Sequence, residues 1–247
     1  MIPPAQETGS DRVTPGHTDD AYAMAWSGGK DSTLALHRAR RQGFHVTHLF
    51  TLFDGATDRV PYHGVRRALV EAQAAALDLE LVTGTTGEDL HGDGPSGFEA
   101  VLLDVLDRLA TLGITGVVFG NIHLQDVRDW YEERVRGRGL DHVEPLWGGE
   151  PLRLAREFVT LGYRGRVVSV HLENGDPAWL GTDLDVRFLG EVGATSGVDA
   201  AGEQGEYHTF VWDGPLFHRT VPVHGTEVRE IRGHRILDLR LADDAQD

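Results

Sequence analysis

Apolar and polar positions alternate along the first half of the chain in blocks that predict strands and helices in turn. Four segments are rich in Ala, Val, Leu and Phe and have the length of buried strands: residues 21–26, 44–53, 79–83 and 115–120. Three segments between them repeat apolar residues at helical spacing: residues 31–42, 65–77 and 98–112. Strands that alternate with helices in this way predict an α/β fold with a doubly wound parallel sheet.

The second half of the chain has a mixed pattern. Helical spacing recurs over residues 152–161, and a Val-rich strand is predicted over residues 164–171. A β-hairpin or extended pair is predicted over residues 221–241, with turns at Gly225 and Gly233. This half therefore predicts a smaller α+β domain.

Residues 27–32 read Ser-Gly-Gly-Lys-Asp-Ser and lie where the first predicted strand passes into the first predicted helix. The N–H groups and positive dipole end of such a helix bind anions, and paired glycines let the backbone close on a phosphate. Lys30 adds a positive charge. It is the only lysine among the 23 Lys and Arg residues of the chain. One explanation is that this site needs a compact ammonium, for which arginine cannot substitute; the other is chance. The loop is not of the Walker type, because Asp31 stands where that loop has Ser or Thr. The alternative interpretation is an ordinary glycine turn with a Ser or Asp cap.

Composition and charge exclude or disfavour several kinds of site and partner. The 247 residues include no cysteine, which excludes disulfides, thiolate metal sites and a cysteine nucleophile such as that of a built-in glutaminase. A formal net charge of −16 disfavours nucleic acid as a partner, because such binding depends on Lys and Arg. No apolar run reaches the roughly 20 residues of a membrane helix, and the N-terminus lacks a secretion signal, so we expect a cytoplasmic protein without a membrane partner. The 13 histidines show no zinc-type spacing, and no structural metal is expected.

Polar residues follow the fourth predicted strand, at the edge of the sheet where ligands bind in such folds. Asn121, His123, Asp126 and Arg128 stand closest to the strand end, and we expect at least two of them to line the cleft. The alternative is a solvated helix face with ordinary ion pairs, to which Glu133 belongs at helical spacing.

A second polar cluster, at residues 202–209, precedes an aromatic strand. Glu203, Glu206, His208 and Thr209 would come together on a loop and a strand start. Paired carboxylates beside a histidine can position an amine, ammonia or a metal. The alternative is a capped turn before a strand.

The loop at residues 27–32 resembles the Ser-Gly-Gly-X-Asp-Ser loop of the ATP pyrophosphatases, the PP-loop superfamily. Four further segments agree with one family in that superfamily: residues 120–134, 144–148, 179–181 and 202–211. Over residues 21–220 the chain is similar to the diphthine–ammonia ligase family and its bacterial relatives. The resemblance implies an adenine nucleotide alpha hydrolase-like fold with an ATP-binding domain at 21–125 and a substrate-binding domain at 126–247. Residues 1–20 are rich in Pro, Thr, Asp and Gly, which predicts a disordered tail.

The resemblance and the placement of polar residues together predict the site. Catalytic roles are expected for Lys30, Asp31 and Glu206, with ATP as substrate and Mg²⁺ held through Asp31. The predicted ATP-binding residues are Ser27, Gly28, Gly29, Lys30, Asp31, Ser32, Leu52, Phe53 and Gly120. The predicted substrate-binding residues are Asn121, His123, Asp126, Arg128, Trp147, Glu203, Gly205, Glu206, His208 and Thr209.

The resemblance implies an amide-forming ligase that adenylates a carboxylate, releases pyrophosphate and transfers ammonia or an amine with loss of AMP. The segment from Gly120 to Asp126 resembles the bacterial type, and Gln204 replaces the usual glycine or asparagine, so the acceptor carboxylate is open. Two alternatives are an ATP-binding regulatory module without turnover and a tRNA-modifying ATP pyrophosphatase. The oligomeric state is also open, with a homodimer as one alternative, and residues 84–97 are predicted as a mobile lid.

Overall fold

The computed structural model describes residues 20–87 and 94–242. The predicted tail at 1–20 therefore lies outside the described residues except for Asp20. Residues 88–93 of the predicted lid also lie outside them.

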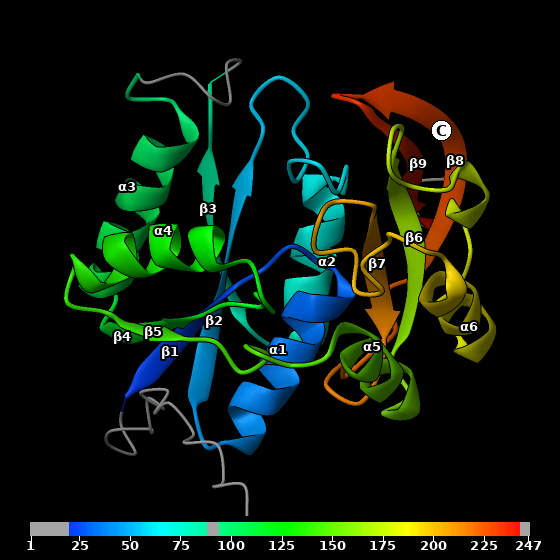
Figure 1. Cartoon of the computed structure of the whole chain (residues 1–247). Coiled ribbons are helices and arrows are strands. Elements are labelled where there is room, and N and C mark those ends of the chain that lie inside the picture. The colour runs from blue at the N-terminus through cyan, green and yellow to red at the C-terminus, as the bar shows by residue number, and fades with distance from the viewer. Residues whose placement is uncertain (1–19, 88–93, 243–247) are drawn as a thin grey trace, which may run out of the picture.

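The first part of the chain forms a parallel sheet covered by helices on both faces, as the sequence predicts (Figure 1). Its strands are β1 (Ala21–Ala25), β2 (His45–Phe53), β3 (Glu80–Thr85), β4 (Ile114–Val118) and β5 (Asp141–Val143), in the order β3-β2-β1-β4-β5. Its helices are α1 (Lys30–Arg41), α2 (Arg67–Leu77), α3 (Phe98–Thr111) and α4 (Gln125–Arg136). Buried residues of α1 and α2 pack on one face of the sheet, and those of α3 and α4 pack on the other. Because β5 pairs with β4, the parallel sheet extends as far as Val143.

The second part forms a four-stranded antiparallel sheet with helices beside it (Figure 1). Its elements are α5 (Pro151–Thr160), β6 (Arg164–His171), a 3₁₀ turn (Pro177–Trp179), α6 (Val186–Ala194), β7 (Tyr207–Asp213), β8 (Val223–Ile231) and β9 (His234–Leu241). The strand order is β7-β6-β9-β8.

The predicted hairpin is present, but the prediction of a turn at Gly225 is wrong. Gly225 lies inside β8, where the register with β9 shifts between Gly225 and Glu227. A glycine within a strand often marks such an irregularity rather than a chain reversal. The reversal itself occurs at Arg232 and Gly233, both of which have positive φ.

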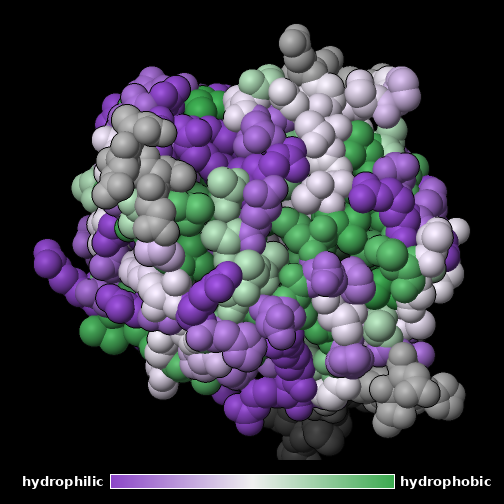
Figure 2. Space-filling view, turned by 180° about the vertical axis from the view of Figure 1, so that it is seen from behind, coloured by the Kyte–Doolittle hydropathy of each residue, from purple (hydrophilic) through white to green (hydrophobic). Residues whose placement is uncertain are grey.

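The two sheets share one apolar core. Val168, Phe210 and Leu239 from the antiparallel sheet pack in the same cluster as Leu34 and Leu69 from α1 and α2. Seen from behind, the molecule presents intermixed hydrophilic and hydrophobic side chains (Figure 2). Within residues 20–87 and 94–242, no helix is long and apolar enough to cross a membrane.

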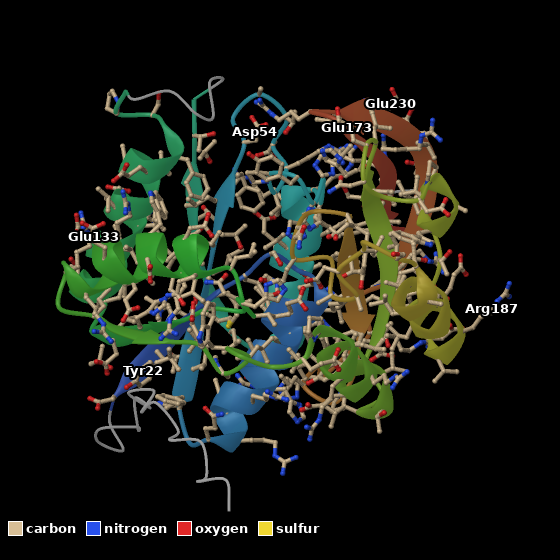
Figure 3. The ribbon with its side chains drawn as sticks, in the orientation of Figure 1. Tyr22, Asp54, Glu133, Glu173, Arg187 and Glu230 are labelled. Carbon is tan, nitrogen blue, oxygen red and sulfur yellow. The ribbon has the colours of Figure 1, made fainter. Side chains whose placement is uncertain are left out.

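A buried ionic cluster also joins the two parts. Asp238 of β9 is fully buried and accepts hydrogen bonds from Arg59 and Arg66, with nitrogen–oxygen distances of 2.6–2.9 Å. Burial alone would raise the pKa of Asp238, but the hydrogen bonds from Arg66 and Arg59 lower it below its ordinary value. Nearby, Arg232 donates to Asp54 at 2.9 Å, and Figure 3 shows Asp54 on the parallel-sheet side of this junction.

We expect Asp238→Asn to lower the free energy of unfolding by about 3–5 kcal/mol, because the buried guanidinium of Arg59 and the half-buried guanidinium of Arg66 lose their counter-charge. Since the folded-state pKa is depressed, the wild-type stabilisation should be present above about pH 4 and be lost as the pH falls through the lower folded value. Chemical unfolding at neutral pH and during acid titration measures both effects.

Asp183→Asn is the matched control, because Asp183 is 51% exposed and pairs with Arg166 at the surface. It should change stability by less than about 1 kcal/mol. Equal effects of the two substitutions would contradict the role given to the buried cluster.

Candidate nucleotide-binding site

A cavity of about 340 Å³ lies at the carboxyl ends of β1, β2 and β4, where ligands bind in doubly wound sheets. Its polar lining residues are Ser27, Asp31, Ser32, Asn121, Glu203 and His208. Its apolar and aromatic lining residues are Trp26, Phe50, Leu52, Val60, Phe98, Leu102, Phe119 and Tyr131. Ser27, Asp31 and Ser32 lie at the start of α1, and we call this part of the lining the polar end.

The polar end is built from the turn that the sequence singles out. Gly28 has a φ of +81°, and its carbonyl oxygen accepts a hydrogen bond from the N–H of Val211 at 2.9 Å. No side chain caps α1 at Gly29. The N–H of Lys30 donates to Thr209 Oγ1 at 2.9 Å. The N–H groups of Asp31 and Ser32 in the first helical turn have no partner inside the helix, and such groups bind anions.

Lys30, which the sequence predicts to be catalytic, has a buried side chain behind the cavity surface. Its side chain is only 3% exposed, and it is not among the residues that line the cavity in the described part of the chain. Its ammonium donates to Asp31 Oδ2 at 2.8 Å and to the carbonyl oxygen of Ala201, and lies 5.0 Å from the centre of the Tyr207 ring. Burial alone would lower the pKa of Lys30, but Asp31, Tyr207 and Glu203 together outweigh burial and raise the net pKa. Lys30 is thus a buried positive charge that links α1 to the loop that precedes β7.

That loop contributes one carboxylate to the cavity and buries another behind it. Glu203 lines the cavity, and its carboxylate accepts from the N–H of His123 at 3.4 Å. Burial raises the pKa of Glu203, and the nearby Asp31 carboxylate raises it further. Glu206 is 1% exposed, and its Oε1 accepts from the N–H of Asp199 at 2.7 Å. The structure therefore places Glu206 as a support for the loop, while Glu203 faces the ligand space.

The predicted ATP-binding residues divide into those at the cavity surface and those behind it. The surface group is Ser27, Asp31, Ser32, Leu52 and Gly120. Gly28, Gly29 and Lys30 shape the turn from behind. Phe53 is fully buried, and the Arg67 guanidinium lies 4.0 Å from its ring centre.

The predicted substrate-binding residues are more dispersed. Asn121, Glu203 and His208 line the cavity. His123 Nε2 pairs with Asp199 beside Glu203. Gly205, Glu206 and Thr209 shape the loop and the strand start around it.

The residues on and near α4 lie farther out. Asp126 is exposed, and Figure 3 shows Glu133 at the outer edge of the same helix, as the alternative of a solvated face anticipates. Arg128 pairs with the buried Glu144 at 3.1 Å and lies 4.5 Å from the ring centre of Trp147. Asn121 reaches the same carboxylate, since its Nδ2 donates to Glu144 Oε1 at 2.7 Å. Burial raises the pKa of Glu144 to about 7.

Several cavity residues escaped the sequence analysis. Trp26, Tyr62, His63, Phe98 and Tyr131 all line the cavity. The ring of His63 stacks on that of His208, with centroids 4.1 Å apart, and burial lowers its pKa to about 3. These two imidazoles are therefore neutral aromatic walls. Residues 61–64, which include the turn before α2, carried a signal in their Pro-Tyr-His-Gly sequence.

The donors at the polar end suit a magnesium ion that arrives with phosphates. Within the described ranges, no group of three or more His, Cys, Asp or Glu side chains can hold an ion alone. Mg²⁺ commonly binds through one or two carboxylates plus phosphate oxygens and water. Asp31 lines the cavity beside Ser27 and Ser32, so its carboxylate fits that pattern.

Gly120 keeps the anion site open. A Cβ atom there would lie 3.1 Å from the nitrogen of Ser32 and 3.2 Å from the carbonyl oxygen of Asp31. We expect Gly120→Ala to weaken pyrophosphate and ATP binding about tenfold or more, because it crowds a hydrogen bond to a charged ligand. Isothermal titration measures this, with Gly190→Ala as the control, since a Cβ at Gly190 meets nothing within 4 Å. Wild-type affinity in Gly120→Ala would contradict the assignment.

Lys30 should matter for stability as well as for activity. We expect Lys30→Met to lower the free energy of unfolding by about 1–3 kcal/mol, because the buried Ala201 carbonyl and Asp31 lose their donor. Lys30→Arg should not restore the wild-type value, since a planar guanidinium replaces a compact ammonium in a closed space. Arg187→Met is the control, because Arg187 projects away from the molecule (Figure 3). A thermal midpoint of Lys30→Met equal to that of Arg187→Met would show that the link made by Lys30 does not stabilise the fold.

Comparison with known proteins divides the chain as its sheets do. Residues 21–142 match the family model described as the diphthamide synthase N-terminal domain, and residues 150–240 match the diphthamide synthase C-terminal domain. The diphthine–ammonia ligase of Homo sapiens is 27% identical over 222 residues, which cover 82% of this chain and 82% of that protein. The diphthine–ammonia ligase of Danio rerio is 29% identical over 218 residues, which cover 81% of this chain and 85% of that protein.

Similar solved structures include the predicted subunit of tRNA methyltransferase from Methanocaldococcus jannaschii, with a TM-score of 0.43 and 18% identity over 77% of this chain and 96% of that chain. The U34-tRNA thiolase NcsA from Methanococcus maripaludis has a TM-score of 0.38 and 18% identity over 59% of each chain. The family assignment depends on the domain models, which together match most of residues 21–240 in order. The chain belongs to the diphthamide synthase family.

Proposed function

We propose that the protein is an ATP-dependent ligase that adenylates a carboxylate and then forms an amide with ammonia or an amine. The observation that carries the proposal is the start of α1, where Asp31 and Ser32 line a cavity that the half-buried Glu203 also lines. The N–H groups of Asp31 and Ser32, unlike that of Lys30, lie in the first helical turn without a partner inside the helix or a side-chain cap from Gly29. An anion site beside an acidic group suits a reaction that needs both a bound triphosphate and a bound amine.

The two ends of the cavity suggest how ATP lies. Its β- and γ-phosphates would sit at the start of α1, with Ser27 and Ser32 as hydroxyl donors. The adenine would occupy the apolar end, near Leu52 and Phe119. Mg²⁺, held by Asp31 and phosphate oxygens, would offset negative charge on the triphosphate.

In the proposed first step, a carboxylate oxygen of the acceptor attacks the α-phosphorus, and the bond to the β-phosphate oxygen breaks. Pyrophosphate leaves, and an acyl-adenylate remains. The turn at residues 27–32 contributes fixed dipoles where charge develops on the leaving group. Holding the carboxylate in line with the α-phosphorus contributes much of the rate.

In the second step, the amine nitrogen attacks the acyl carbon, and the bond to the AMP oxygen breaks. An attacking amine has to lose a proton on the way to the amide. Glu203 is the group that we assign to hold the amine and accept that proton, because burial and Asp31 favour its protonated form. Glu206 acts through the loop that carries Glu203 and is a positioning residue in this account.

Membership of the diphthamide synthase family makes an ATP-utilising ligase or pyrophosphatase the expected class. The relatives named above are called diphthine–ammonia ligases, which supports a carboxylate and ammonia as co-substrates. We name the acceptor only by its chemical class, as a carboxylate. A regulatory module that binds ATP without turnover would have no use for the carboxylate of Glu203 in the cavity. A tRNA-modifying ATP pyrophosphatase is disfavoured by the net charge of −16, because binding to nucleic acid depends on Lys and Arg.

The products of ATP turnover test the proposal. We expect purified protein with Mg²⁺, ATP, ammonium and a pool of carboxylates, including cell extract, to form AMP and pyrophosphate. Asp31→Asn should reduce this turnover about a hundredfold or more, as for a group that helps to bind the reacting phosphates. Asp104→Asn is the control, since Asp104 is 68% exposed on α3.

Two results would contradict the proposal. ADP and phosphate as products would mean that the β–γ bond is cleaved instead. Tight ATP binding without any product would favour the regulatory module.

A further inference from the structure

Gln73 is a polar residue on the buried face of α2. It is 0% exposed and lies among Leu69, Val70, Ala74 and Leu77, which are also buried. A buried amide is costly unless its hydrogen-bonding groups find partners. The sequence analysis assigned Gln73 no role, although a glutamine inside an apolar helix stripe is itself a signal.

Both ends of the Gln73 amide are used, by a residue of the cavity lining, by the turn before α1 and by the backbone of β7. Its Oε1 accepts from Trp26 Nε1 at 2.9 Å, and Trp26 lines the cavity. Its Nε2 donates to the carbonyl oxygen of Gly28 at 3.0 Å and to that of Val211 at 2.6 Å. Because one end meets a donor and the other meets two acceptors, the orientation of the amide is determined by its partners.

The Gly28 carbonyl oxygen accepts a second hydrogen bond, from the N–H of Val211 at 2.9 Å. Two donors, one from α2 and one from β7, therefore pull this oxygen to the back of the turn. No peptide bond in the described residues is cis, so the N–H of Gly29 points opposite to the Gly28 oxygen. The N–H of Gly29 donates to Ser27 Oγ at 3.3 Å, and Ser27 lines the cavity.

Gly28 leaves no room for a side chain. Its φ is +81°, and a Cβ there would lie 2.7 Å from Gln73 Oε1. Without the two rear donors, the Gly28–Gly29 peptide would be free to rotate and turn a carbonyl oxygen toward the phosphates. A carbonyl oxygen in that position repels an anion, whereas an N–H attracts it.

We propose that Gln73 is a positioning residue for the phosphate site, which keeps the Gly28–Gly29 peptide oriented with its N–H on the hydroxyl of Ser27, a residue of the cavity wall, and its oxygen away from the cavity. The proposal rests on the proposed function only in taking the ligand to be the pyrophosphate part of ATP. Gln73 touches no ligand and acts through the backbone of the turn and through Trp26.

Two substitutions of similar size test this in the full chain. Gln73→Met removes all three hydrogen bonds without adding charge. Gln73→Glu keeps an acceptor for Trp26 but places a carboxylate against the carbonyl oxygens of Gly28 and Val211. Leu109→Ala is the control for lost stability, because Leu109 is a buried residue of α3 in the cluster on the other face of the sheet.

We expect both Gln73 variants to bind inorganic pyrophosphate about tenfold or more weakly than the wild type, as expected from misaligned donors to a charged ligand. Leu109→Ala should unfold at a lower temperature and bind within twofold of the wild type. The deficit of Gln73→Glu should shrink as the pH falls from about 8 to about 5, because a protonated carboxyl donates a hydrogen bond again. The deficit of Gln73→Met should stay constant over that range.

Pyrophosphate binding by both Gln73 variants within twofold of the wild type would overturn the proposal. The proposal would also be overturned if the Gln73 variants lost no more pyrophosphate affinity than Leu109→Ala while their thermal midpoints fell by the same amount. Failure of the wild type itself to bind pyrophosphate or ATP would overturn the proposed function as well, and is thus distinguishable from a failure of Gln73 alone.

Discussion

The carbonyl oxygen of Gly28 is the point on which the site depends. A phosphate-binding turn has to present N–H groups to its ligand, so its carbonyl oxygens must be held elsewhere. Here the N–H of Val211 and the amide of Gln73 hold that oxygen from behind. One donor comes from the antiparallel sheet and the other from the parallel-sheet part, so neither part forms the turn by itself.

The same dependence explains why charged groups are buried at the junction. Lys30 reaches across to Ala201 and Tyr207, and Asp238 reaches across to Arg59 and Arg66. Buried charges are costly unless paired. Asp238 has its counter-charges on the other part of the chain, whereas Lys30 pairs with the neighbouring Asp31 and finds its second acceptor, the Ala201 carbonyl oxygen, on the other part. Both parts must therefore dock correctly before these contacts are complete, which links folding of the junction to formation of the cavity.

Much of this could be predicted from local sequence. The alternation of strands and helices indicated the parallel sheet, and residues 27–32 indicated the anion site, because both signals depend on neighbours in the chain. Long-range burial was beyond such reasoning. Nothing near Lys30 in the sequence shows that residue 201 covers it. Nothing near Glu206 shows that its carboxylate turns inward to Asp199 while Glu203 faces the cavity. Gly225 was assigned to a turn because glycine marks turns and strand irregularities alike.

The central claim is that the N–H groups of Asp31 and Ser32 bind the phosphates. Amide resonances of a ¹⁵N-labelled protein, followed by NMR during titration with pyrophosphate, test it most directly. The account predicts that the amide signals of Asp31 and Ser32 move most and become protected from solvent exchange, while amides of α6 do not change. Saturable binding that leaves those two signals unmoved would contradict it.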